Sequence, residues 1–108
     1  MAIRAKSGPT LAKNSATPGG LVTVTAKIEN SGAEEARVRL VADLGASTFA
    51  FDPSSFPIPP KSRTVVTFTW AASLPEGKPA HTYRGKLILT EPASGRAIAD
   101  APLDLYVG

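Results

Sequence analysis

Residues able to carry out chemistry are few in this sequence. His81 is the only histidine among 108 residues, and there is no cysteine. A nucleophilic triad needs a base held beside its nucleophile, and the chain lacks a G-x-S-x-G motif. Zinc and copper sites use several imidazole or thiolate ligands, which a single histidine cannot supply. We therefore expect His81 to be an ordinary polar residue at a strand start, and we expect no metal and no cofactor.

Nine carboxylates remain as candidates for acid–base chemistry. Glycosidases place two carboxyl groups across a sugar cleft, whereas Glu34-Glu35 and Asp52-Pro53 both fall at expected turns. No set of acidic residues follows the spacing of a calcium-binding loop. Pro18-Gly19-Gly20 precedes a strand instead of a helix, so it is not a phosphate-binding loop. The sequence thus predicts no catalytic residues and a chain that is not an enzyme.

Basic side chains form one surface feature that could recognise a partner. If the strand beginning at Ala36 pairs with the strand beginning at His81, strand alternation turns four cations outward on one sheet: Arg37, Arg39, Arg84 and Lys86. Such a face could meet an acidic polysaccharide, a phosphate backbone or an acidic protein. The alternative is a solvated face that Asp43 and Asp104 partly neutralise. We expect weak, salt-sensitive binding to polyanions at most, with no specific nucleic acid.

The opposite sheet should expose a threonine array. Thr23, Thr25, Thr67 and Thr69 share the outward parity of their strands. A flat array of this kind can contact sugars or ice, but threonine is also a favoured residue on strand surfaces. We expect the second, purely structural role.

Apolar and polar residues alternate along most of the chain, and no stretch has helical spacing. Between Leu21 and Asn30, one buried and one solvated face are predicted, with Val22, Val24, Ala26 and Ile28 pointing inward. The same alternation predicts further strands over residues 36–44, 48–51, 64–70, 81–90 and 96–107. In these strands Trp70 and Tyr83 have inward parity, so we expect them to be the large anchors of the core.

Prolines and glycines mark the breaks between these strands. Residues 53–60 contain four prolines, which lack the N–H needed in a sheet interior, so we expect no regular sheet interior there. The segments 18–20, 30–32 and 91–95 are expected turns. Pro102 should mark a bulge or an edge in the last strand.

These features predict an all-β, immunoglobulin-like antiparallel β-sandwich of about seven strands. A chain of this length makes one domain, residues 1–108, with residues 1–17 forming an N-terminal arm and first strand. The N-terminal segment lacks the apolar run of a signal peptide, and no stretch could span a bilayer as a helix. We therefore expect no membrane insertion.

Three stretches of the chain resemble a known family. The stretches are "GGLVTVTAKIENSGAEEARVRLV", "IPPKSRTVVTFTW" and "HTYRGKLILTE". They resemble the bacterial cell-adhesion-related domain CARDB. They are also similar to Ig-like accessory modules of secreted bacterial and archaeal enzymes. The stretch "FAFDPSSFPIPPKSRTVVTF" also resembles the sandwich of major sperm protein and of pilus chaperones. These motifs are structural and supply no active-site residues. The resemblance implies a spacer, adhesion or protein-contact role.

The first functional hypothesis is a non-catalytic structural or adhesion module that contacts a protein or a surface polymer. Its compartment would be extracellular or the cell surface if the domain belongs to a longer chain. The alternative is a small decoration or assembly protein of a virion or another large particle, found in the virion or the cytoplasm. A carbohydrate-binding accessory domain is a weaker alternative.

Stability should rest on the apolar core, because the chain has no disulfide and no expected metal. We predict that neither a chelator nor a reductant changes the melting temperature measured by circular dichroism. A fall of several degrees on adding the chelator would show a metal site that this reasoning missed.

Overall fold

The computed structural model describes residues 3–108, which form nine β-strands and no helix. The strands are β1 (Ile3–Leu11), β2 (Ser15–Ala16), β3 (Leu21–Asn30), β4 (Ala36–Asp43), β5 (Thr48–Ala50), β6 (Phe56–Ile58), β7 (Ser62–Ala71), β8 (His81–Glu91) and β9 (Arg96–Val107). Accordingly, no helix in this range could cross a membrane.

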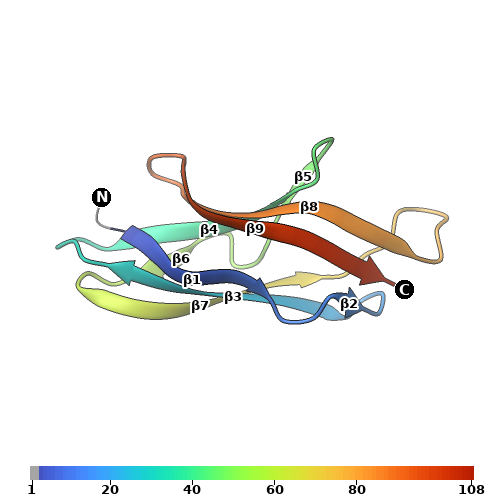
Figure 1. Cartoon of the computed structure of the whole chain (residues 1–108), viewed down its shortest axis with the longest axis horizontal. Helices are drawn as coiled ribbons and strands as arrows, with labels where there is room; N and C mark the ends of the chain where they lie inside the picture. Colours follow the sequence, from blue (N-terminus) through green and yellow to red (C-terminus); the bar gives the residue numbers. More distant parts are fainter. Residues whose placement is uncertain (1–2) are drawn as a thin grey trace.

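Two sheets face each other across the core (Figure 1). One sheet has the strand order β1-β3-β7, and the other has the order β2-β9-β8-β4-β5, with β6 also paired to β4. The long pairings are antiparallel, and only the two-residue β2 runs parallel to its neighbour β9. The predicted all-β sandwich of antiparallel sheets is confirmed at this level.

Alternating residues of both sheets fill the space between them. From β3, the series Val22, Val24, Ala26 and Ile28 is buried, as the sequence predicts. The facing sheet contributes the buried series Val38, Leu40, Ala42, Leu87, Leu89, Leu103, Leu105 and Val107. Burying this apolar surface is the main favourable contribution to folding for a chain without disulfides.

Two strands exceed the seven that were expected. One of them is β6, a short strand that lies within residues 53–60 and includes Pro57. It is a three-residue strand that pairs with β4, so Pro57 needs a sheet neighbour on only one side. The second addition is β2, whose two residues are too few to show a period.

The C-terminal strand resolves the question about Pro102. The register of β9 with β8 is continuous there, with Pro102 opposite Lys86, and the irregularity lies instead between Leu89 and Thr90. The N–H of Tyr106 points to the outer edge, where it donates to the carbonyl of Asn14. Every second residue of a strand directs its N–H to the same side, and position 102 is four residues before Tyr106. An N–H at position 102 would therefore face the outer edge, so the proline removes no hydrogen bond to β8.

Trp70 and Tyr83 lie at the rim of the core and are only partly buried, so their predicted role as its central anchors is wrong. Phe51 and Phe68 are the aromatic residues with the least exposed surface, at 2% and 1%. Trp70 instead stacks on Phe49, with ring centroids 4.4 Å apart, and meets the edge of Tyr83 at 5.3 Å. The inward parity of Trp70 on β7 was correct, since both of these partners belong to the facing sheet.

Asn30 is the only buried polar residue within the described range, and its side chain joins both sheets. It ends β3, and its amide nitrogen donates to the carbonyl of Ile58 in β6 at 3.2 Å. The same nitrogen donates to the carbonyl of Glu34 at 2.9 Å, and Oδ1 accepts from the N–H of Gly32 at 3.0 Å. Asn30 therefore fixes the turn between β3 and β4 and holds β6 in place.

A second close contact depends on Gly85 in β8. A Cβ at this position would overlap the carbonyl oxygen of Asp43, where β4 ends and the chain turns. Only a residue without a side chain lets the two backbones approach this closely.

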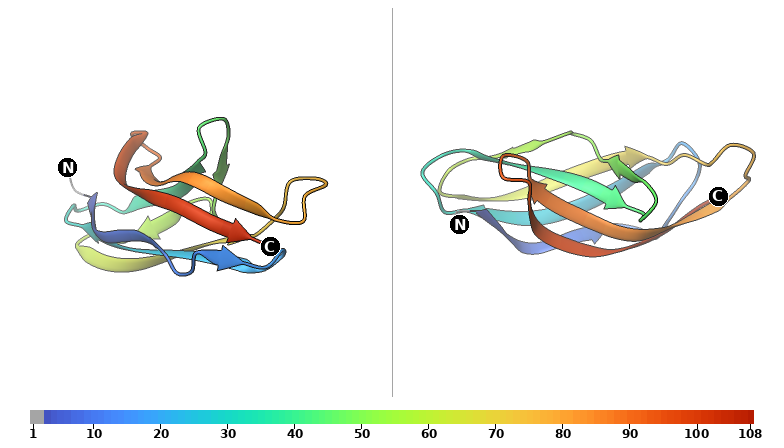
Figure 2. Two further views of the ribbon diagram at one scale, coloured as in Figure 1. Left: turned by 45° about the vertical axis from the view of Figure 1, so that its right-hand side comes forward. Right: turned by 90° about the horizontal axis from the view of Figure 1, so that it is seen from above.

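The molecule is elongated, with extents of 49 × 23 × 19 Å. Figure 2 shows that β1 begins near one end of the long axis and β9 finishes near the other. The pairings agree with this view, since Ile3 lies opposite Asn30 while Val107 lies opposite His81 and Ala16.

We predict that Asn30→Ala lowers the free energy of unfolding by about 1–3 kcal/mol, because it leaves buried backbone groups without partners. Urea unfolding followed by Trp70 fluorescence measures this change. Asn14→Ala is the control, since that residue is exposed and its carbonyl bond to Tyr106 survives the substitution. An equal, small effect of both substitutions would contradict the structural role of Asn30.

Candidate functional site

The structure places the predicted basic residues on the outer side of one sheet but does not gather them. Arg37 and Arg39 lie on β4, Arg84 and Lys86 lie on β8, and all four are exposed. Arg39 is opposite Thr90, six residues along β8 from Arg84. At about 3.3 Å per residue, the row that contains Arg39 and the row that contains Arg84 are about 20 Å apart.

Carboxylates separate these cations further. Arg84 lies 3.8 Å from Asp104, and Arg37 lies 3.4 Å from Glu35. Asp43 is directly opposite Lys86 in the sheet. We call this outer side of β4, β8 and β9 the mixed face, because its charges alternate in sign.

The outer side of the β1-β3-β7 sheet is different. Arg4, Lys27 and Arg63 project from its three strands, and the only carboxylate in their rows is Glu29. Lys6 lies in a bulge of β1, while Lys13 and Lys61 lie in the adjoining loops. Lys61 lines a hollow together with Glu29 and Arg63. We call this surface the cationic face.

The two sides of the sandwich therefore differ in net charge. Six of the twelve cations of the chain belong to the cationic face, with one of the nine carboxylates. The other six cations share the remaining surface with eight carboxylates. The net charge of +3 thus combines a strongly positive sheet with a weakly negative remainder.

Glu29 binds two arginines at one end of the cationic face. The register sets Arg4, Glu29 and Arg63 side by side on β1, β3 and β7. Glu29 Oε1 lies 2.8 Å from the guanidinium of Arg4, and Oε2 lies 3.0 Å from that of Arg63. Hydrogen bonds from Arg63 and then from Arg4 hold the pKa of Glu29 below its usual value. The row keeps a net positive charge while its side chains are held in place.

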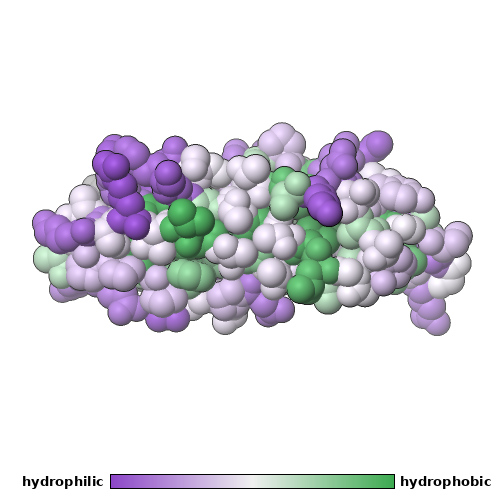
Figure 3. Space-filling view, turned by 90° about the horizontal axis from the view of Figure 1, so that it is seen from below, coloured by the Kyte–Doolittle hydropathy of each residue, from purple (hydrophilic) through white to green (hydrophobic). Residues whose placement is uncertain are grey.

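Threonines occupy the middle of the cationic face. The register sets Thr25 beside both Thr10 and Thr67, and sets Thr23 beside Thr69. Figure 3 shows this side of the molecule, largely pale over its middle with hydrophobic patches among the pale residues, and with strongly hydrophilic residues toward both ends, most of them at the end where β1 begins. The result is a surface of hydroxyl groups flanked by cations and by the exposed side chains of Leu21 and Val65, with no aromatic side chain among the paired outward positions of its strands.

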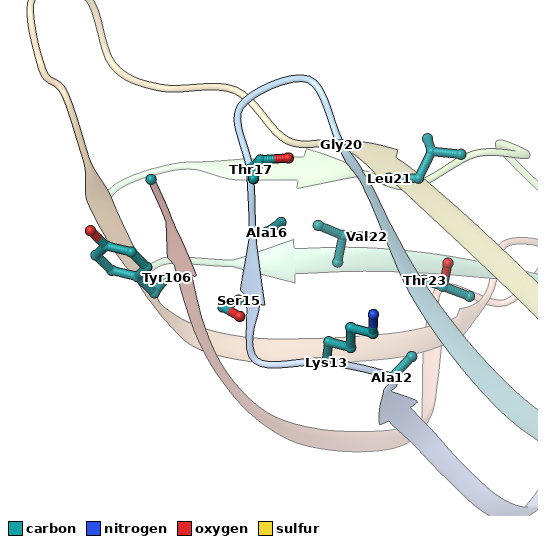
Figure 4. A pocket seen from close by; sticks show the side chains of 11 residues that line it. Ala12, Lys13, Ser15, Ala16, Thr17, Gly20, Leu21, Val22, Thr23 and Tyr106 are labelled. Carbon is teal, nitrogen blue, oxygen red and sulfur yellow. The ribbon is translucent and has the colours of Figure 1, made fainter.

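A groove of about 720 Å³ adjoins the other end of this face. It lies between the loop after β1, β2, the start of β3 and the end of β9 (Figure 4). Ala16 and Val22 point toward each other across it, with Lys13 at one side and Tyr106 at the other. Lys13 and Thr23 both line the groove, so it extends the cationic face to this end of the molecule.

Sequence reasoning identified the threonines but missed the cations beside them. Strand alternation turns Lys27 outward. Arg4, Lys6 and Lys13, however, lie in the N-terminal arm, and the sequence did not predict which strand that arm pairs with. Alternation indicates that the side chains of Glu29 and Arg63 point outward, but only the register of β3 with β7 shows that the two residues are neighbours.

Comparison with known proteins finds structures of similar fold but no matching protein family. No protein-family model matches the sequence, and no curated protein matches it. A solved structure of Pseudomonas fluorescens alkylpurine DNA glycosylase AlkC, bound to DNA containing an abasic site analog, is similar with a TM-score of 0.66 and 7% identity. The likeness covers 96% of this chain but only 30% of the glycosylase.

Two further structures are similar over nearly the whole of this chain. A Niemann-Pick type C2 protein from Japanese carpenter ant has a TM-score of 0.53 and 13% identity, covering 100% of this chain and 94% of that protein. A CARDB domain of Pyrococcus furiosus, in complex with di-metal ions, has 17% identity and a TM-score of 0.47, covering 99% and 86%. A CARDB domain, the family expected from the sequence, is thus among the similar structures, at low identity.

The prediction that the chain is not an enzyme is contradicted by the first of these comparisons. The DNA glycosylase is an enzyme, and its chain contains a β-sandwich of this shape. The prediction relied on missing catalytic motifs in a single sandwich domain. Such a domain can form part of a catalytic chain whose reacting groups lie elsewhere, so the absence of motifs was not a sufficient reason.

The lowered pKa of Glu29 makes its contribution dependent on pH. A carboxyl group with a lowered folded-state pKa stabilises the fold above its ordinary pKa, and this stabilisation disappears as the pH falls through the folded-state pKa. We predict that Glu29→Gln lowers the melting temperature at neutral pH and that the difference from the native chain shrinks in acid. Glu34→Gln is the control, because Glu34 is exposed and forms no ion pair in the described part of the chain. A difference that stays constant with pH would contradict the assigned pairing.

Proposed function

We propose that the chain is an immunoglobulin-like accessory module that contacts an anionic polymer through its cationic face. The observation that carries this proposal is the segregation of charge between the two sheets. A flat surface with one dominant sign of charge attracts polyanions by long-range electrostatics. The mixed face lacks this property, because carboxylates lie within a few ångströms of its cations.

Strand order supports the immunoglobulin-like assignment. In such domains, strands A, B and E face strands C, F and G. Here β1, β3 and β7 face β4, β8 and β9, in orders that correspond to A-B-E and G-F-C. CARDB-like modules belong to the same broad class of sandwich, so a spacing or contact role follows from the proposal.

The chemistry of the cationic face suits phosphate groups. Lysine, arginine, serine and threonine supply most of the contacts that proteins make to nucleic-acid backbones. The ten residues of β3 extend about 33 Å at 3.3 Å each, close to one helical turn of a DNA duplex, which is about 34 Å. No aromatic side chain is available on the paired positions to stack on bases or sugars, so the contact would be to the backbone, independent of sequence.

Duplex DNA is the first polymer to test, because a solved protein with this fold is bound to DNA. We predict that the native chain binds a short duplex at low salt and that replacing Lys6, Lys13, Lys27 and Lys61 with glutamine strongly weakens this binding. Fluorescence anisotropy over a salt series measures this. The slope of log K against log salt should flatten by about 0.9 for each lysine that meets a phosphate.

The control replaces the four cations of the mixed face with glutamine: Arg37, Arg39, Arg84 and Lys86. Both variants remove four positive charges from exposed positions, so they have the same net charge and a similar expected stability. The control should keep most of the affinity. Equal losses would show that net charge alone governs binding, and an absence of binding by the native chain would remove the proposal.

A further inference from the structure

The outer edge of β7 has unpaired backbone groups along its length. Thr69 donates its N–H to the carbonyl of Asp52 and accepts from the N–H of Asp52, both at 2.8 Å, on the side away from β3. In an antiparallel ladder, every second residue directs both groups to the same side. Arg63, Val65 and Thr67 therefore point their N–H and C=O groups outward, where no strand of residues 3–108 pairs with them.

Every other long edge of the sandwich is interrupted. β1 has two register shifts between Ala5 and Thr10. On β9, Pro102 removes an outward donor, and β2 covers the last two residues. The outer side of β4 is covered by β5 and by β6, which has a proline at its centre. Proteins use such devices to prevent strands from pairing across molecules.

β7 has none of these devices over its paired length. Its ten residues pair with β3 without a register shift, and they include neither proline nor glycine. Val65 lies at the centre of the open edge with 60% of its surface exposed. A regular, exposed and β-branched edge of this kind is a template for another strand.

We propose that the open edge of β7 binds β7 of a second copy of this chain, antiparallel about a two-fold axis at Val65. Val65 then lies opposite Val65 of the second copy, and Arg63 lies opposite Thr67 of the second copy. Each of these facing pairs can exchange two backbone hydrogen bonds. The two three-stranded sheets become one continuous sheet in the order β1-β3-β7-β7-β3-β1.

Charge and register favour a second copy as the occupant. No like charges face each other in this register, and Arg63 is already paired with Glu29 at 3.0 Å. The pairing ends before Thr69, whose outward backbone groups are already paired with Asp52. Two-fold self-pairing uses the same patch on both molecules, which is the commonest form of protein association.

Single cysteines test the register directly, because the chain has no cysteine of its own. In a hydrogen-bonded antiparallel pair the Cα atoms are about 5.5 Å apart, which a disulfide can span. The two Thr67 residues would be about 13 Å apart, since four residues separate them along the strand. We expect Val65→Cys to form a covalent dimer on oxidation and Thr67→Cys to form no covalent dimer. Equal crosslinking of both, or none of Val65→Cys, would overturn the proposal.

Sedimentation equilibrium of the native chain tests association without a crosslink. High salt is used, since it screens the repulsion between two chains of charge +3. The average mass should rise from 11.2 kDa toward twice that value as concentration increases. Val65→Lys sets two ammonium groups opposite each other and should keep the mass at the monomer value, whereas Val65→Thr and Thr25→Lys should not. A native chain that stays monomeric at every concentration, or a Val65→Lys variant that still dimerises, would overturn the inference.

Discussion

The side chain of Asn30 is the constraint on which the arrangement of the two sheets depends. One amide group at the end of β3 holds β6 through Ile58 and the following turn through Glu34 and Gly32. A buried amide is costly unless all its groups are paired, so it tolerates only one relative placement of these segments. Apolar packing alone would permit small shifts of one sheet over the other.

Within each sheet, the strand registers decide which charges meet. On the β1-β3-β7 sheet, Glu29 is the one carboxylate within the rows of cations, and it holds two arginines. On the other sheet, Asp43 faces Lys86 and Asp104 faces Arg84. The outer surfaces of the two sheets thus differ in their electrostatic character.

Alternation of residue types was sufficient to predict the long strands and most of the core, because burial of one face imposes period two on the sequence. It could not predict β2 or β6, which are too short to show a period. The cationic face escaped prediction for a different reason. This face brings Arg4 close to Arg63, which is 59 positions later in the chain. The bulges and registers of β1, β3 and β7 determine which residues become neighbours, and no local sequence pattern shows them.

The placement of the two chain ends has a mechanical consequence. Ile3 and Val107 lie toward opposite ends of the 49 Å axis, and the strands run along that axis. A stretching force applied there acts along β1 and β9 and loads their hydrogen-bonded ladders in shear. Bonds loaded in shear must break together, whereas strands peeled from one end separate one bond at a time. The sandwich is therefore oriented to resist tension along its length.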